Sequence, residues 1–264
     1  MTPLAWGTLL LAMAVVLLAH PLSAQEWGDL TITFVYGAPA PDPVPLEITA
    51  DHEHCGRFNV VDESLTVNPE NRGVANVFVW LSLRRGETAP DAHPSYAETA
   101  DDKVLLDNEE CRFAPHALVL RTSQTLVVSN SDPIGHNCRI DTFANPPINY
   151  TVPAHGQFEH RFERPERLPS RVSCSIHPWM SGWLLIKDNP YMAVSDEDGK
   201  LLVRNLPVGK WTFQVWHQRA GFVDRVTVDG AETTWTRGRL EVDVQAGEND
   251  LGEVQLAPVL FADR

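Results

Sequence analysis

Short segments of the chain alternate apolar with polar residues, and this period of two predicts β-strands. Residues 30–36, LTITFVY, place threonine between bulky apolar side chains, as a strand with one buried face does. No segment keeps a helical period over several turns. Further strands are predicted over residues 74–83, 117–120, 125–128, 171–174, 182–187, 201–203, 211–216, 222–228, 240–244 and 251–256. The pattern therefore predicts an all-β fold made of β-sandwiches.

The spacing of these strands predicts two modules. Asp188-Asn189-Pro190 ends the first series of strands, and beyond it short strands alternate with turns such as residues 194–200 and 205–209. We therefore assign residues 25–189 to a first module and residues 190–264 to a second, smaller sandwich. Within the first module, residues 85–110 are polar, acidic and contain proline, which predicts a surface loop or insertion.

The first residues have the features of a secretory signal peptide. Residues 9–18, LLLAMAVVLL, are apolar, and a proline and small residues lead to Ala24. We expect cleavage after Ala24, which removes residues 1–24 and leaves a periplasmic or secreted protein. The alternative is an uncleaved anchor, but the apolar run is shorter than the roughly 20 residues of a spanning helix. Export also permits disulfide formation.

Composition excludes several classes of function. The chain of 264 residues carries 21 Lys and Arg against 35 Asp and Glu, a formal net charge of −14. Binding to nucleic acid needs a basic surface, so it is not expected. An acidic surface attracts a basic partner, with an effect that salt screens. The motifs of serine hydrolases, zinc proteases and phosphate-binding loops are missing from the sequence, so we expect no enzyme.

The segment CSIHPWM carries the most specific chemical signal. It places the thiol of Cys174, the imidazole of His177 and the thioether of Met180 three residues apart in a short connection between two predicted strands. Cysteine thiolate and methionine thioether are soft ligands that suit copper, and a second histidine would complete a type 1 set. His136, in a loop after the strand at 125–128, is the candidate.

Other interpretations of these residues remain open. Cys174 could pair with Cys138 in a disulfide, His177 could lie on the surface, and Met180 could fill the core. Zinc is a further candidate, although it rarely accepts a thioether. After cleavage the chain would hold only Met180 and Met192, which makes a chance methionine at this position less expected.

With this motif the sequence resembles the cupredoxins, the type 1 copper proteins that include plastocyanin, pseudoazurin and amicyanin. The short Cys-x-x-His-x-x-Met loop is most similar to that of amicyanin, and residues 130–137, NSDPIGHN, resemble the loop of the first ligand. The resemblance extends over residues 112–187. It implies a cupredoxin-like Greek-key β-sandwich and a mononuclear copper site. The ligands that it implies are His136, Cys174, His177 and Met180.

The same resemblance implies a function and its supporting residues. One-electron transfer would be the activity, with a redox protein such as a cytochrome or a dehydrogenase as partner. The backbone amide of Asn137 would donate to the thiolate sulfur. His177 would lie near the surface as the electron port, with Pro178 and Trp179 as its apolar rim.

The second module carries a resemblance of its own. Residues 193–217, AVSDEDGKLLVRNLPVGKWTFQVWH, are similar to carboxypeptidase-regulatory-like domains, which are transthyretin-type sandwiches. The whole chain resembles exported bacterial proteins labelled methylamine utilisation proteins, in which such a domain follows a cupredoxin-like one. Two other functions stay open: a non-redox module that binds carbohydrate or a cell surface, and a periplasmic protein that binds and delivers copper.

The remaining cysteines give one further expectation. Cys55 and Cys111 are predicted to form a disulfide in the exported protein. The alternative is a second metal site built from His52, His54 and Cys55. Cys138, two residues beyond His136, is expected to be buried and inert.

Overall fold

The computed structural model describes residues 25–84 and 86–262. The predicted signal peptide, residues 1–24, lies outside the described residues. Among the helices of the described part, none combines the length and the apolar character that a membrane span requires.

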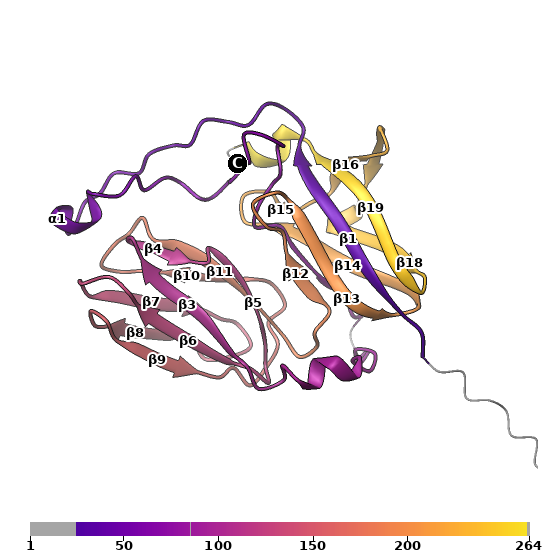
Figure 1. Cartoon of the computed structure of the whole chain (residues 1–264), viewed down its shortest axis with the longest axis horizontal. Coiled ribbons are helices and arrows are strands. Elements are labelled where there is room, and N and C mark those ends of the chain that lie inside the picture. The colour runs from indigo at the N-terminus through magenta and orange to yellow at the C-terminus, as the bar shows by residue number, and fades with distance from the viewer. Residues whose placement is uncertain (1–24, 85, 263–264) are drawn as a thin grey trace, which may run out of the picture.

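The described strands form two β-sandwiches, which confirms the prediction of an all-β fold (Figure 1). One sheet of the first sandwich has the order β5-β11-β10-β7-β8, and the other has the order β4-β3-β6-β9. The strands of this sandwich are β3 (Lys103–Glu109), β4 (Arg112–Ala114), β5 (Ala117–Arg121), β6 (Thr125–Asn130), β7 (His136–Asp141), β8 (Ile148–Val152), β9 (Gln157–His160), β10 (Ser170–Ser173) and β11 (Ser181–Lys187).

The second sandwich combines strands from both ends of the chain. One sheet has the order β13-β1-β19-β16-β17; the other has the order β12-β2-β14-β15, with β18 also paired to β14. Its strands are β1 (Trp27–Tyr36), β2 (Phe78–Leu81), β12 (Met192–Val194), β13 (Lys200–Pro207), β14 (Gly209–His217), β15 (Gly221–Phe222), β16 (Arg225–Val228), β17 (Ala231–Thr234), β18 (Arg239–Val244) and β19 (Gly247–Leu256). The described helices are short: α1 (His52–Cys55), η1 (Pro94–Ala97), η2 (Thr236–Gly238) and η3 (Pro258–Phe261).

The first sandwich is inserted into the second, which differs from the predicted boundaries. The sequence assigned residues 25–189 to the first module, but β1 lies between β13 and β19, and β2 pairs with β12 and β14. Met192 of β12 is opposite Trp80 of β2, so the chain leaves and re-enters the second sandwich on neighbouring strands. Alternation along residues 30–36 identifies a half-buried strand, but it contains no information about which strands will be its partners.

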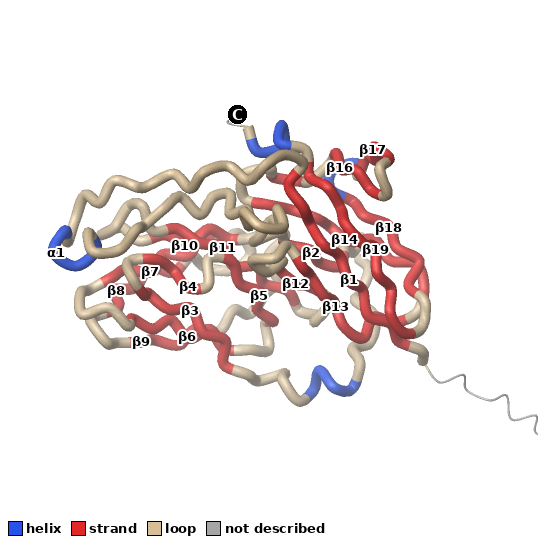
Figure 2. Tube along the Cα trace, turned by 45° about the horizontal axis from the view of Figure 1, so that its top comes forward, coloured by secondary structure: helices blue, strands red, loops and turns tan. Residues whose placement is uncertain are grey.

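A long arm connects β1 to β2. We define the arm as residues 37–77; it leaves the second sandwich, crosses to the far end of the first and returns (Figures 1 and 2). Its outgoing and returning legs hydrogen-bond to each other, through Leu46 and Val60 and through Asp62 and Val44. Helix α1 lies at the tip of the arm, beside the first sandwich. The arm therefore places residues from the start of the chain against the inserted sandwich.

Part of the predicted surface loop at residues 85–110 is a strand. β3 pairs in parallel with β6 and contributes Leu106 to the core. The sequence pattern did not reveal this strand because it contains polar residues. Asn108 is fully buried and donates from Nδ2 to the carbonyl oxygen of Ser129 at 2.6 Å. A buried polar side chain is stable in a sheet when it is hydrogen-bonded, but it breaks the apolar pattern of the sequence.

Each sandwich has its own apolar core, and a third cluster joins the two. This joining cluster contains Phe78, Trp80 and Trp216 from the second sandwich and Ala117 and Leu185 from the first. The rings of Trp183 and Trp216 meet edge to face with their centroids 4.8 Å apart. Because aromatic pairs add to the energy of apolar burial, this cluster fixes the sandwiches against each other.

The loop after β7 is held by one buried carboxylate. Glu166 accepts hydrogen bonds from the backbone amides of Phe143, Ala144 and Asn145 and from Nδ2 of Asn145, at 2.9–3.1 Å. Burial raises the pKa of this carboxyl, but the hydrogen bonds outweigh burial and leave the pKa below its ordinary value. The ionised form is therefore the stabilising one.

We expect Glu166→Gln to lower the free energy of unfolding at pH 7 by about 2 kcal/mol, because hydrogen bonds to a charged acceptor are lost. The folded-state pKa is depressed, so the contribution is complete above the unfolded value near 4.3 and disappears as the pH falls through the folded value. Urea unfolding at pH 7 and at pH 3 measures this: the gap between wild type and variant should narrow at pH 3. Equal stability at pH 7 would contradict it.

Candidate metal centre

Two neighbouring strands bring the predicted ligands together. His136 is the first residue of β7, rather than part of a loop as predicted, and Cys174 directly follows β10. These strands are antiparallel neighbours, with Ser173 opposite Arg139. The start of β7 and the end of β10 therefore lie at the same end of the sheet. The loop that contains Cys174 and His177 lies at this end.

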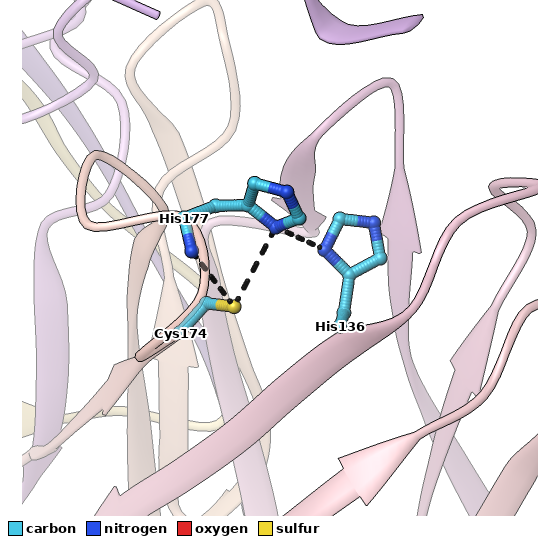
Figure 3. A group of neighbouring side chains, drawn as sticks. All are labelled: His136, Cys174 and His177. Atoms are coloured by element: carbon cyan, nitrogen blue, oxygen red, sulfur yellow. Dashed lines mark hydrogen bonds between the residues drawn. The ribbon is translucent and has the colours of Figure 1, made fainter. Parts of the chain in front are cut away.

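The loop of residues 174–180 folds back on itself before β11. The backbone amide of Met180 donates to the carbonyl of His177 at 2.9 Å, and the amide of Cys174 donates to the carbonyl of Met180 at 3.3 Å. This turn aims His177 back at the cysteine, whose Sγ lies 3.8 Å from Nδ1 of His177 (Figure 3). Met180 is buried at the end of the loop, in the same apolar cluster as Cys174.

Three candidate ligand atoms converge in the interior. Nδ1 of His136 lies 2.9 Å from Nδ1 of His177, and the two rings and the sulfur of Cys174 face one another (Figure 3). One ligand atom from each of the three residues lies within 4.8 Å of the others. His136 and His177 are 0% exposed and Cys174 is 4% exposed. The structure therefore brings together the two imidazoles and the thiol that the sequence singled out.

A carboxylate holds the remote nitrogen of each imidazole. Nε2 of His136 lies 2.8 Å from Oδ2 of Asp132, and Nε2 of His177 lies 2.8 Å from Oδ2 of Asp51. When a metal ion displaces the proton of Nδ1, an imidazole that donates from Nε2 presents a lone pair on Nδ1. Two such lone pairs cannot hydrogen-bond to each other, whereas a metal cation between them would use both. This set of donors therefore fits a metal ion.

The electrostatics around Cys174 favour its thiolate. Burial alone would raise the pKa of the thiol, but hydrogen bonds from the His136 and His177 side chains and from the amides of His177 and Asn137 lower it to about 5. The thiolate, which is the metal-binding form, is then dominant at neutral pH. The pKa of His136 is raised: burial lowers it, but Asp132 and Cys174 outweigh burial.

Asp132 links the site to its surroundings. Its two oxygens accept from Nε2 of His136, from Nε2 of His54 and from the backbone amides of Glu110 and Cys111, at 2.8–3.1 Å. Burial opposes ionisation, but these hydrogen bonds lower the pKa of the carboxyl to about 2. Asp132 is therefore ionised at neutral pH beside His136, and it fixes the ring orientation.

Asn137 also holds the cysteine in place. Its backbone amide donates to Sγ of Cys174 at 3.3 Å, as the resemblance implied. Its side-chain Oδ1 accepts from the amide of Ser175 at 3.0 Å, and its Nδ2 donates to Asn149. The residue therefore holds the ligand loop to β7 and β8.

The resemblance implied that His177 lies near the surface, and the structure places it directly beneath a partly exposed side chain. Its ring is completely buried, because Asp51 in the arm lies over it. Pro178 is exposed and Trp179 is half-buried, with its ring centroid 5.1 Å from that of His177. The sequence did not predict this cover, because the covering residue comes from a segment distant along the chain.

The arm also determines the state of Cys55 and Cys111. Cys55 and Cys111 form the predicted disulfide, which confirms that expectation. A second metal site from His52, His54 and Cys55 is contradicted, because the sulfur of Cys55 is bonded to sulfur and Nε2 of His54 contacts Asp132. For the same reason Cys111, which lies near His54 and Asp132, offers no thiolate.

Cys138 is a buried free thiol in the core of the first sandwich. Burial, and then the nearby charge of Cys174, raise its pKa to about 12. It stays protonated at neutral pH and is neither bonded to Cys174 nor grouped with the three candidate ligands.

Two residues that contact the candidate ligands, Asp132 and Asp51, were not predicted from the sequence. Asp132 lies four residues before His136, so a search for carboxylates near each ligand could have found it. Asp51 lies 126 residues before His177, and no local pattern links the two.

No protein-family model and no curated protein matches the chain. Solved structures match it in part. A purple cupredoxin from Nitrosopumilus maritimus is 24% identical, covers 33% of this chain and 100% of its own, and has a TM-score of 0.27. A reduced mutant of amicyanin is 18% identical, with coverages of 34% and 88% and a TM-score of 0.29.

A copper-containing nitrite reductase from Thermus scotoductus is 19% identical, with a TM-score of 0.29. It covers 40% of this chain, and the chain spans only 25% of its length.

Proposed function

We propose that this chain is an exported copper protein that transfers single electrons through a type 1 site. The observation that carries the proposal is the convergence of Nδ1 of His136, Nδ1 of His177 and Sγ of Cys174 in the buried end of a β-sandwich. Met180, buried at the end of the same loop, would supply the weak axial ligand.

The ligand types favour copper over the other candidate metals. Two imidazoles and one thiolate, with a thioether in the same loop, are the set that defines type 1 copper sites. Structural zinc sites use four cysteine, histidine or carboxylate ligands, and a thioether is a poor fourth ligand for zinc. The carboxylates of Asp51 and Asp132 are occupied by the remote nitrogens of the two imidazoles.

The residues around the site supply rigidity. When bound, copper provides a one-electron couple. His136 begins a strand, both imidazoles are held by carboxylates, and Cys174 accepts from two backbone amides. Because the packed interior resists movement, the ligands would keep nearly the same positions in both oxidation states. Small movement is what fast electron transfer requires.

We propose that the protein works outside the cytoplasm. Cleavage after Ala24 would place the protein in the periplasm or outside the cell, where the Cys55–Cys111 disulfide is stable. The net charge of −14 favours a basic redox partner such as a cytochrome or a dehydrogenase. We propose no catalytic reaction, and we propose that the C-terminal strands form a carboxypeptidase-regulatory-like domain.

Copper delivery is the second candidate for the same ligands. A delivery protein must exchange its metal readily, whereas the three candidate ligands here are buried and His177 is covered by the arm. The burial favours retention of copper and therefore electron transfer.

We expect the purified protein to bind one Cu(II) ion and to develop an intense visible band from charge transfer between thiolate and copper. Titration of the metal-free protein with Cu(II), followed by absorption, measures this. Titration with Zn(II) is the control and should give no colour. Rapid loss of the band to a chelator would favour copper delivery, and a colourless copper-treated protein would overturn the type 1 assignment in favour of a binding module.

A further inference from the structure

The arm carries a charged side chain into direct contact with a candidate copper ligand of the other sandwich. Oδ2 of Asp51 lies 2.8 Å from Nε2 of His177. The His177 side chain is 0% exposed, while the Asp51 side chain is 44% exposed. Asp51 therefore forms the outer surface over the imidazole, and it separates the ring from solvent.

The local structure of Asp51 is specialised for this contact. An aspartate directly before a helix usually accepts a hydrogen bond from an amide in the first turn. Asp51 precedes α1 but makes no such side-chain bond, and its backbone is left-handed, with φ 46° and ψ 42°. Aspartate and asparagine tolerate this conformation better than most residues. The backbone thus directs the carboxylate to His177 instead of to its own helix.

Two further contacts fasten α1 over the site. The Cys55–Cys111 disulfide joins its last residue to the inserted sandwich, and Nε2 of His54 contacts Oδ1 of Asp132 at 3.1 Å. Asp132 in turn holds His136. The helix therefore connects to both candidate histidine ligands: through Asp51 to His177, and through His54 and Asp132 to His136.

We propose that Asp51 is a positioning residue that fixes the His177 ring, strengthens electron donation from its metal-binding nitrogen and thereby lowers the reduction potential of the copper site, with the arm as a solvent-excluding cap. This inference rests on the proposed copper function. A carboxylate that accepts the remote N–H of an imidazole pushes electron density to the metal-binding nitrogen. Because Cu(II) carries more charge than Cu(I), it gains more from this density, so the oxidised form is stabilised.

The first test compares Asp51→Asn with wild type and with Asp42→Asn. The amide keeps an acceptor oxygen and tolerates the left-handed backbone, so only the charge is lost. Asp42 is an exposed acid in the same arm and controls for net charge. Loss of such a supporting group typically weakens metal binding about 10- to 100-fold. If the loss is tenfold and falls on Cu(II) alone, the potential rises by 59 mV.

The second test needs no metal. Diethyl pyrocarbonate modifies accessible imidazoles, and peptide mass spectrometry can compare His177 with the exposed His52 in one sample. We expect His177 to be protected in the metal-free wild type and labelled in Asp51→Gly, because glycine adopts the left-handed backbone but removes the side chain. Equal labelling of His177 and His52 in the wild type would overturn the cap.

The outcomes separate this inference from the proposed function. A wild type with the visible band and an Asp51→Asn potential equal to that of Asp42→Asn would overturn the role of Asp51 alone. A wild type without the band would overturn the copper function, and the labelling experiment would then still decide whether Asp51 covers His177.

Discussion

Cys174→Ser is expected to abolish the intense visible band of the copper-loaded protein. The band requires charge transfer from a thiolate, and Cys174 is the thiol that lies with His136 and His177 in the buried site. Serine offers a hard hydroxyl that stays protonated at neutral pH, so it replaces neither the charge nor the softness of the sulfur. Absorption spectra of both proteins at equal copper content measure the effect.

Cys138→Ala is the matched control. Cys138 is the other free cysteine of the described chain and is also buried, but its thiol is held protonated. We expect this variant to keep the band. If Cys174→Ser stayed coloured while Cys138→Ala became colourless, the assignment of the sulfur ligand would be wrong.

Removing the disulfide is expected to have the largest effect on stability. Cys55 and Cys111 are 56 residues apart in sequence, and closing a loop of that length restricts the unfolded chain by about 4 kcal/mol. The double variant Cys55→Ala, Cys111→Ala should lose roughly this amount, since alanine leaves no unpaired thiol or buried hydroxyl. Urea unfolding of the metal-free protein, with the wild type as reference, gives the difference.

The same double variant should also release copper faster. The disulfide fastens α1 beside the Asp51–His177 contact, so the free arm would expose His177 more often. The rate at which a chelator removes the visible band reports this opening. An unchanged rate together with an unchanged unfolding free energy would show that the arm is held by its other contacts.

The sequence predicted the strands well where one face is buried. Residues 30–36 and 211–216 lie within β1 and β14, because alternation follows from the geometry of a strand. It failed at β3, where the buried Asn108 interrupts the apolar pattern and donates from Nδ2 to the carbonyl of Ser129 in β6. It also failed to predict that β1 pairs with β13 and β19, since pairing depends on contacts that are distant along the chain.

Some residues of the candidate site could be predicted from the sequence, and others could not. Cys174, His177 and Met180 occur within one loop, so their spacing reveals them, and His136 joins them because β7 and β10 are neighbours. Asp51 could not be predicted, because its role depends on where the arm lies rather than on the residues beside it. The burial of His177 followed from the same unpredicted contact.

The insertion of one sandwich into the other also sets an order for folding. Tyr36 pairs with Leu256, so the outer sheet cannot close until almost the whole chain is available. The strands of the inner sandwich pair with one another between Lys103 and Lys187. Shorter-range pairing forms faster. The candidate metal centre, the Cys55–Cys111 disulfide and the Asp51–His177 contact can therefore form while the last strands of the outer sandwich are still unpaired.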